Sequence, residues 1–246
     1  MHSLYSFDFI ATVTAQLMDR LRTTSASQLN TAALLNMTNY QIKAGHSQGV
    51  YVVHYAGRPV YVGKAQNISI RLTDHLFKLS GRRNIDTRQI YFQAIYLDQS
   101  MSTAANENLL ISQYKMLNAE MWNGAGFGTK DPGRERDTTR PNGFDQAFPI
   151  NELYYINLEL APDYSILLSN LLENMKAQLP YVFRYGSLGF EGNRRIILPN
   201  HQMPARSVLQ SIVTILGGSW QGVILSYGMV LYNERKTYAH ATVLLP

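Results

Sequence analysis

The 246-residue sequence contains no cysteine. This absence excludes a disulfide scaffold, a cysteine-based zinc site and a thiol nucleophile. The six histidines are scattered and form no His-Glu-x-x-His motif or other metal-binding cluster. No run of eighteen apolar residues occurs, and the N-terminus lacks the basic region and apolar core of a signal peptide. We therefore expect a soluble cytoplasmic protein with no membrane partner.

Two glycine-rich segments fall short of catalytic motifs. The run Gly186-Ser187-Leu188-Gly189 is one residue away from a hydrolase nucleophile elbow. The run 124–128 (GAGFG) lacks the Lys-Ser/Thr ending of a phosphate-binding P-loop. A net charge of +5 and a pI near 9.3 allow a phosphate-backbone partner without demanding one.

Two short segments rich in valine and tyrosine predict a β-hairpin. They are Gly49–Tyr55 (GVYVVHY) and residues 59–63 (PVYVG). Both compositions suit a pleated, half-buried surface, and Gly57 lies in the turn between them. The hairpin alone has an ordinary alternative, in which its tyrosines are simply core residues.

The turn length decides where the tyrosines point. A three-residue loop with Gly57 in the left-handed conformation pairs Val53 with Tyr61 and Tyr51 with Gly63. Both tyrosines then project from one face of the sheet, with open space at Gly63 beside Tyr51. A two-residue loop would put the tyrosines on opposite faces.

A helix is predicted to begin after Asn67, a residue suited to the N-cap. Its apolar stripe at helical spacing consists of Ile68, Leu72, Leu76 and Leu79. Arg71 and His75 are four residues apart and lie one turn apart on another face. Arginine can hold a phosphate oxygen and stabilise developing charge, and histidine can accept a proton near neutral pH. The alternative is a solvated polar face.

The segment from Thr103 to Leu117 predicts a second helix, capped by Ser102 or Thr103. Glu107 shares its apolar face, which consists of Leu110, Ile111 and Tyr114. A carboxylate on a buried face needs a partner or a metal, because an unpaired buried charge is costly. Mg²⁺ commonly uses one protein carboxylate together with substrate phosphate and water. A glutamate paired with a lysine or arginine at the helix rim is the alternative.

A later segment completes an ordered set of motifs. It contains Trp122-Asn123, Gly126-Phe127-Gly128, Asp131-Pro132-Gly133-Arg134 and Phe144-Asp145. Together with the hairpin, Arg71, His75 and Glu107, this order resembles the GIY-YIG nuclease superfamily, with valine replacing isoleucine in both halves of its signature. The later motifs resemble its type II restriction endonuclease branch. The resemblance covers roughly two fifths of the chain, from Gly49 to Asp145.

The sequence departs from the family pattern in three ways, and one assignment within it has two candidates. Met116 stands where a proline is common, and the gap between Glu107 and Asn123 is a few residues longer than usual. Asn118 is a second candidate for the family asparagine, although the Trp-Asn motif favours Asn123. Thr129-Lys130 replaces an Asn-His-like pair.

The resemblance implies an α+β fold whose nuclease core is a small three-stranded antiparallel sheet flanked by helices. It also implies that Glu107 holds one Mg²⁺ or Mn²⁺ ion. Tyr51 would activate the attacking water as a general base, with its proton passed towards His75 or solvent. Because a free tyrosine titrates near pH 10, this role needs positive neighbours, and Lys64, Arg71 and the metal would supply them.

The resemblance assigns roles to three more contacts at the substrate. Tyr61 would position the water or the phosphate, and Arg71 would clamp a non-bridging oxygen. Asn123 would orient the phosphate or a metal-bound water.

Basic residues gather in the two segments that flank the expected site. We expect these residues to contact DNA phosphates, with scattered solubilising charge as the alternative. They are Arg82, Arg83 and Arg88 after the helix of Arg71, and Lys130, Arg134, Arg136 and Arg140 in the glycine-rich segment and its continuation.

The flanks of the core suggest three segments. Residues 1–45 would be an N-terminal helical extension, 46–150 the nuclease core with its DNA-contacting loop, and 151–246 an α+β region for recognition or oligomerisation. The N-terminal helix has apolar residues at Phe9, Ile10, Val13, Leu17 and Leu21. The C-terminal region should contain a strand over 154–160, helices over 162–179 and 204–216, and strands over 220–225, 229–233 and 242–245.

We therefore expect a Mg²⁺-dependent type II restriction endonuclease that makes double-strand breaks in double-stranded DNA at a short palindrome. One site cuts one strand, so the enzyme would act as a homodimer or a tetramer. Its host would contain a cognate DNA methyltransferase. The alternatives are a structure-specific or defence nuclease of the same fold, or a non-catalytic nucleic-acid-binding protein.

Overall fold

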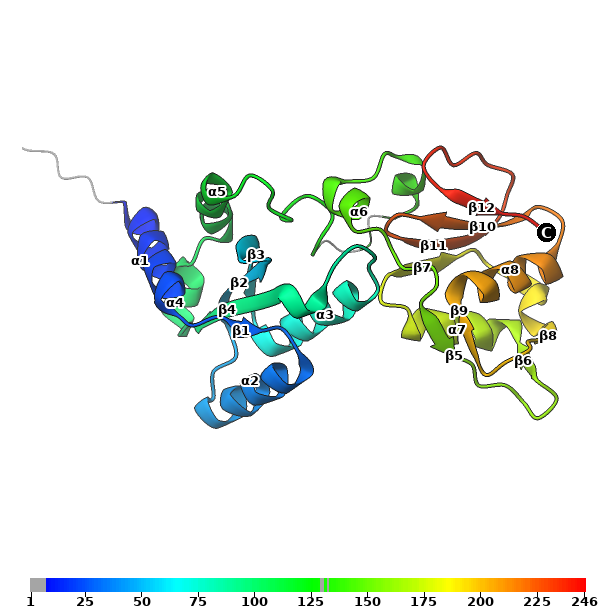
Figure 1. Ribbon diagram of the computed structural model, residues 1–246, viewed down its shortest axis with the longest axis horizontal. Helices are drawn as coiled ribbons and strands as arrows, with labels where there is room; N and C mark the ends of the chain where they lie inside the picture. Colours follow the sequence, from blue (N-terminus) through cyan, green and yellow to red (C-terminus); the bar gives the residue numbers. More distant parts are fainter. Residues whose placement is uncertain (1–7, 129–130, 132) are drawn as a thin grey trace, which may run out of the picture. The chain divides into compact units, whose positions relative to one another are not determined.

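The computed structural model describes residues 8–128, 131 and 133–246, without the side chains of residues 103 and 104. The chain divides into two compact units (Figure 1). Unit 1 comprises Met1–Phe77 and Asp86–Gly128, and unit 2 comprises Lys78–Ile85 and Thr129–Pro246. This division differs from the three expected segments, since residues 1–45 share a unit with the hairpin and residues 129–150 belong with the C-terminal region.

Unit 1 is built on a four-stranded antiparallel sheet of order β1-β4-β2-β3. Its strands are β1 (Ser27–Gln28), β2 (Gly49–Tyr55), β3 (Arg58–Ala65) and β4 (Ile90–Tyr96). Its helices are α1 (Phe9–Thr23), α2 (Thr31–Ala44), α3 (Ile68–Ser80), α4 (Gln99–Ala104) and α5 (Glu107–Leu117), with the 3-10 helix η1 (Thr87–Gln89). The α+β class is confirmed, and the sheet has one very short strand more than the three expected.

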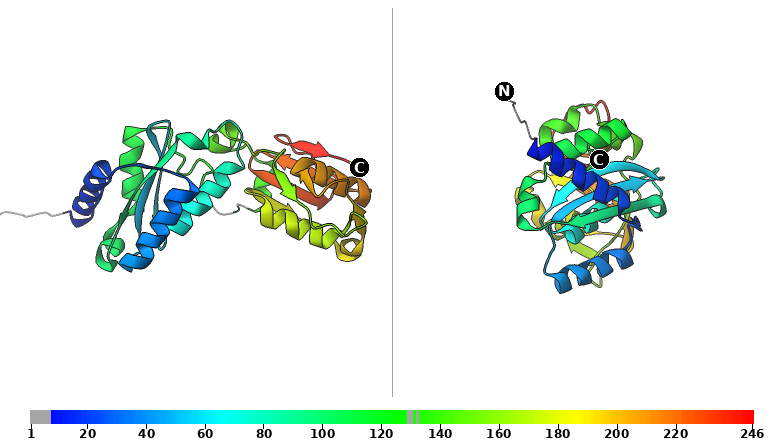
Figure 2. Two further views of the ribbon diagram at one scale, coloured as in Figure 1. Left: turned by 60° about the horizontal axis from the view of Figure 1, so that its bottom comes forward. Right: turned by 90° about the vertical axis from the view of Figure 1, so that its left-hand side faces the viewer.

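Helices cover both faces of this sheet, with α1 on one side and α2 on the other (Figure 2, left). On the α1 side, alternate valines of the hairpin pack against α1 and α5; this core contains Val50, Val52, Val62, Leu17 and Leu110. On the α2 side, Tyr40 stacks on Tyr96 of β4 with ring centroids 5.3 Å apart. Helix α3 lies on this second side, where Ile68 contacts Gly49.

The register of the hairpin is confirmed at both tyrosines. Val53 lies opposite Tyr61, and Tyr51 lies opposite Gly63. Tyr51 and Tyr61 therefore share the face covered by α2 and α3.

The predicted three-residue turn is wrong. The turn contains two residues, Ala56 and Gly57, with φ of 50° and 79°. A β-bulge follows, because His54 pairs with Pro59 and leaves Val60 as an extra residue on β3. A two-residue turn alone would have put the tyrosines on opposite faces, and the bulge shifts the register back by one residue.

The predicted start of α3 is confirmed, whereas that of α5 is wrong. Asn67 Oδ1 accepts the backbone N–H of Ile70 at 3.1 Å. The single helix expected from Thr103 is two helices, because the chain turns extended at Ala105 and Asn106. Asn106 then caps α5 by accepting the N–H of Leu109 at 3.1 Å. Glu107 consequently lies at the first position of a helix.

Unit 2 contains a four-stranded mixed sheet of order β12-β10-β11-β7 and two two-stranded sheets, β5-β9 and β6-β8. The strands are β5 (Tyr155–Asn157), β6 (Ser165–Leu167), β7 (Val182–Tyr185), β8 (Arg195–Ile197), β9 (Gln202–Pro204), β10 (Trp220–Leu225), β11 (Gly228–Asn233) and β12 (Thr242–Leu244). The helices are α6 (Gly143–Ala147), α7 (Leu168–Gln178) and α8 (Ala205–Leu216), with 3-10 helices η2 (Arg134–Thr138) and η3 (Gly189–Asn193).

In the C-terminal region, the structure confirms the predicted helix α8 and the predicted strands β10, β11 and β12. The strand expected over 154–160 is shorter in the structure, where β5 covers only Tyr155–Asn157. The helix expected over 162–179 begins only at Leu168, because Tyr164 has a left-handed φ of 60° and Ser165 starts strand β6. Helices α7 and α8 bury one face of the large sheet, in a core that includes Leu171, Val208, Ile212 and Leu231. Within the described ranges, none of the helices has the length and apolarity to cross a bilayer.

Candidate active site

Tyr51, Tyr61 and His75 form a compact cluster in unit 1. The hydroxyl of Tyr51 lies 2.8 Å from Nε2 of His75, and the tautomer of the imidazole decides which atom donates. The ring of Tyr61 meets that of His75 edge-on, with centroids 5.1 Å apart. The exposed fractions are 0 %, 6 % and 0 % in the order Tyr51, Tyr61, His75. Thus the structure brings together three of the residues that the sequence singled out.

Gly63 allows this arrangement, although not by leaving open space as expected. The ring of Tyr51 lies directly over Gly63, so that any Cβ at this position would overlap its hydroxyl end. The close approach explains why a glycine follows the Tyr-Val of β3.

The loop from Trp122 to Gly128 covers the cluster. The ring of Phe127 lies 4.7 Å from that of His75 and 5.2 Å from that of Tyr61, between centroids. Gly128 has a φ of 79°, and a Cβ there would lie 2.6 Å from the hydroxyl of Tyr61. Its carbonyl accepts a hydrogen bond from the guanidinium of Arg71 at 2.9 Å. The sequence marked the Gly-Phe-Gly motif but not this anchoring of Arg71.

Two asparagines attach this part of the chain to the free edge of β3. Asn123 accepts the N–H of Val62 at 2.9 Å and donates to its carbonyl at 2.8 Å. Asn118, at the C-cap of α5, donates to the carbonyl of Pro59 at 2.8 Å. Because both amides bind backbone, they act as positioning residues rather than as substrate contacts in this arrangement.

The electrostatics of the cluster keep Tyr51 protonated. Burial raises the pKa of Tyr51 well above its ordinary value near 10. Neighbouring Tyr61 and Glu107 raise this pKa further, and the positive charge of Arg71 opposes the shift. A free tyrosinate at position 51 is therefore not the resting state near neutral pH.

Glu107 is the metal ligand that the sequence predicts. Its side chain is partly buried at the first position of α5, beside the buried Leu110 and Tyr114 of the same face. Among the described side chains it has no ion pair or hydrogen bond, so the alternative of a rim glutamate paired with a base is not seen. The described residues contain no cluster of three metal-ligating side chains. A single unpaired carboxylate still fits Mg²⁺, which keeps most of its waters and takes substrate phosphate as a ligand.

Lys64 lies away from this cluster. Next to Gly63 in β3, it projects from the opposite face of the sheet, where Val50 is its cross-strand neighbour. Its ammonium group donates to the carbonyl of Ser102 and, at 3.2 Å, to that of Ala105. The structure therefore places Lys64 at the C-terminal end of α4, and the expected support of Tyr51 by Lys64 is wrong in this geometry.

The residues expected to contact DNA phosphates divide into two groups. Arg82 and Arg136 are largely buried and both bind the carboxylate of Asp145, so neither guanidinium is available to a phosphate in this state. In both cases the expected DNA contact is replaced by a structural ion pair.

The exposed members differ in their pairing. Arg134 binds Glu234, and Arg88 binds Asp86 at 2.9 Å. Arg83 and Arg140 are exposed and have no ion pair among the described residues. The remaining member, Lys130, lies outside the described residues.

No protein-family model matches this sequence. A search of curated proteins also finds no significant match. The resemblance to a nuclease superfamily therefore depends on the residues and geometry given above.

Proposed function

We propose that this chain is a Mg²⁺-dependent DNA endonuclease of the GIY-YIG type, and specifically a type II restriction enzyme that acts as a homodimer on a short palindrome. The observation that supports it best is one arrangement in unit 1. Tyr51, Tyr61, Arg71 and His75 gather on one sheet face, and the charge of Glu107, which has no ion pair among the described residues, raises the pKa of Tyr51. Under this proposal the host also has a cognate DNA methyltransferase.

Glu107 would hold the metal ion. Its carboxylate is partly buried and has no ion pair or hydrogen bond within the described part of the chain. The first turn of a helix also favours a negative charge. When bound there, Mg²⁺ supplies positive charge that stabilises the scissile phosphate and the leaving oxygen.

The hydrogen bond between Tyr51 and His75 would move a proton without requiring a free tyrosinate. One proton of the attacking water passes to the hydroxyl oxygen of Tyr51, while the hydroxyl proton of Tyr51 passes to Nε2 of His75. The resulting hydroxide attacks phosphorus, the bond to the leaving oxygen breaks, and His75 ends as the imidazolium. Of the two routes expected from the sequence, transfer to His75 or to solvent, this relay uses His75, because burial keeps the pKa of Tyr51 high.

Arg71 and Tyr61 would position the substrate. The guanidinium of Arg71 is only partly buried, and its bond to the Gly128 carbonyl uses one of its five N–H donors. Hydrogen bonds to the hydroxyls of Tyr51 and Tyr61 engage further donors, and those that remain can bind a non-bridging phosphate oxygen. Tyr61 belongs to the same cluster, with its ring centroid 6.2 Å from that of Tyr51, and would orient the attacking water.

Plasmid cleavage tests the proposal. The full chain is incubated with unmethylated plasmid in Mg²⁺ or in EDTA, and Glu107→Gln is compared with the wild type and with Glu120→Gln. Glu120 is an exposed carboxylate in the loop after α5, which makes it a matched control. We expect discrete Mg²⁺-dependent fragments that Glu120→Gln retains and Glu107→Gln loses by at least about 100-fold.

Each other outcome favours a different protein. Nicks or a smear without discrete fragments would favour a structure-specific or defence nuclease. A gel shift without any cleavage would favour a non-catalytic nucleic-acid-binding protein. Cleavage by Glu107→Gln at the wild-type rate would disprove the assignment of the metal ligand.

A further inference from the structure

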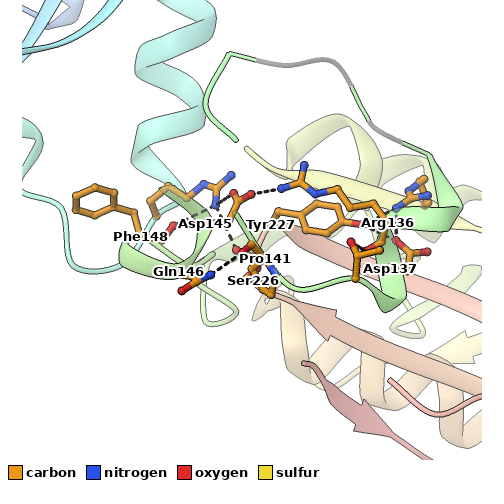
Figure 3. A network of polar contacts seen from close by, with 11 residues as sticks. Arg136, Asp137, Pro141, Asp145, Gln146, Phe148, Ser226 and Tyr227 are labelled. Atoms are coloured by element: carbon orange, nitrogen blue, oxygen red, sulfur yellow. Dashed lines mark hydrogen bonds and ion pairs between the residues drawn. The ribbon is translucent and has the colours of Figure 1, made fainter. Parts of the chain in front are cut away.

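Unit 2 holds the chain over residues 133–148 through two buried carboxylates. The first is Asp145, which is 0 % exposed. Arg82 donates to it at 3.0 Å. Arg136 binds its other oxygen, as Figure 3 shows. Arg82 also donates to the carbonyls of Phe148 and Ser226, both in this unit, at 3.0 and 3.2 Å.

The second carboxylate is Asp137, which is 3 % exposed. Arg184 of β7 binds it, and the hydroxyls of Tyr227 and Tyr232 donate to it at 2.5 and 3.3 Å. Figure 3 shows Asp137 and Asp145 on the two sides of Tyr227. The guanidinium carbon of Arg136 lies 4.4 Å from the centroid of the Tyr227 ring.

This network determines the conformation of a short surface segment. Residues 138–143 lie between the two carboxylates and contain no strand and only the ends of η2 and α6. A buried ion pair contributes little net stability compared with apolar packing, but here the pairs attach both ends of the segment to the rest of unit 2. A segment held at both ends in this way presents its exposed side chains in a fixed geometry.

The exposed side chains of the 138–143 segment are suited to hydrogen bonding with a partner. Arg140 and Asn142 are exposed, and among the described residues neither side chain has an ion pair or hydrogen bond. Asn142 occupies the N-cap of α6, yet its side chain does not cap the helix. Gly143 follows with open space around its Cα, so another molecule can approach the backbone closely.

We propose that the 138–143 segment reads base edges in double-stranded DNA, with Arg140 and Asn142 as specificity-determining residues and Asp137 and Asp145 as positioning residues. This inference rests on the proposed function. Arginine binds guanine through two acceptors of the major groove, and asparagine binds adenine through a donor and an acceptor. Arg82, Arg134, Arg136 and Arg184 are paired with carboxylates, whereas Arg140 has no ion pair among the described residues.

Selection from a randomised duplex library tests the proposal. The full chain binds the library in Ca²⁺ instead of Mg²⁺, and bound sequences are compared for wild type, Arg140→Ala, Asn142→Ala and the control Arg194→Ala. Arg194 is an exposed arginine paired with Glu191 elsewhere in unit 2. We expect the wild type and the control to select one short site. In Arg140→Ala and in Asn142→Ala, the preference for the correct base should fall about 10- to 100-fold at one position of the site. The preferences at the other positions should be unchanged.

A further variant addresses the positioning role. Circular dichroism first shows whether the Asp145→Asn variant is folded. The folded variant should lose selectivity at the two base pairs that Arg140 and Asn142 read, while still binding DNA non-specifically. If this variant does not fold, the two surface variants decide the question. The proposal is overturned if Arg140→Ala and Asn142→Ala both select the wild-type site, or if the wild type selects no sequence.

The same experiments separate this inference from the proposed function. Site selection without Mg²⁺-dependent cleavage would remove the endonuclease and leave base reading in place. Cleavage without site selection would support the endonuclease and remove base reading by the 138–143 segment.

Discussion

The side-chain amide of Asn123 hydrogen-bonds both the N–H and the carbonyl of Val62, at 2.9 and 2.8 Å. It thereby continues the hydrogen-bonding pattern of the sheet beyond the last strand. The N–H of Trp122 makes a further bond to the carbonyl of Val60. Since the loop that follows covers Tyr61 and His75, Asn123 controls the site by holding this loop on β3.

A substitution can separate this role from that of a metal or phosphate contact. Asn123→Asp keeps the acceptor for Val62 N–H but places a carboxylate against the Val62 carbonyl, where no donor remains. We expect Asn123→Asp to lower the free energy of unfolding in urea by about 2 kcal/mol, at least as much as Asn123→Ala. Cleavage should fall in parallel in both variants. An aspartate variant with intact stability and stronger Mg²⁺ dependence would instead mark Asn123 as a metal ligand.

Gly128 offers a test of the loop that covers the tyrosines. Gly128→Ala introduces both an unfavourable φ and a Cβ 2.6 Å from the Tyr61 hydroxyl, so we expect a loss of about 3 kcal/mol in unfolding free energy. Gly124→Ala is the matched control, because Gly124 has a φ of 75° but no atom near its Cβ position. That variant should lose only about 1 kcal/mol. Equal losses would show that the contact with Tyr61 contributes nothing.

Lys64 and Arg71 should behave in opposite ways. Lys64→Met removes two hydrogen bonds to carbonyls at the end of α4 and should cost about 1–3 kcal/mol of stability. Its rate of plasmid cleavage should remain within about threefold of the wild type, since no reacting group is removed. Arg71→Met should lower the rate by about 100-fold or more. Urea melts and single-turnover cleavage rates measure the two effects. A large rate loss in Lys64→Met with unchanged stability would restore Lys64 to the catalytic set.

Much of unit 1 could be predicted from local pattern. The valine-tyrosine composition marks β2 and β3, and Asn67 marks the start of α3. The bulge at Val60 could not be predicted, because alternating valines read equally well in either register. The face of Lys64 was in fact available from strand alternation, since residues next to Gly63 must project from the other side. There the family resemblance led to the wrong expectation.

The ion pairs of unit 2 were beyond the reach of the sequence. Arg82 and its partner Asp145 are 63 residues apart, and nothing local distinguishes a buried arginine from one that meets solvent. The cluster of arginines near Arg136 therefore resembled a DNA-binding patch. Only the burial of the partner carboxylates shows which of these charges are neutralised.

Tyr51 gives a prediction on the alkaline side of the stability profile. Its pKa is raised in the folded state, so the folded protein holds this proton after the unfolded chain has released it near pH 10. The unfolded state then binds fewer protons than the native state, and stability must fall as the pH rises above about 10. Each such tyrosine contributes a slope of up to about 1.4 kcal/mol per pH unit.

Tyr51→Phe removes one of the groups whose ionisation makes the free energy of unfolding depend on pH. Below about pH 9 the free energy of unfolding of the variant should differ from that of the wild type by a constant amount. This difference reflects the lost hydrogen bond to His75. Between about pH 10 and 11 its stability should fall less steeply, by up to about 1.4 kcal/mol per pH unit. Urea unfolding at a series of pH values measures both slopes. Parallel curves up to pH 11 would mean that Tyr51 ionises in the folded protein as readily as in the unfolded chain, and a tyrosinate base would then be available after all.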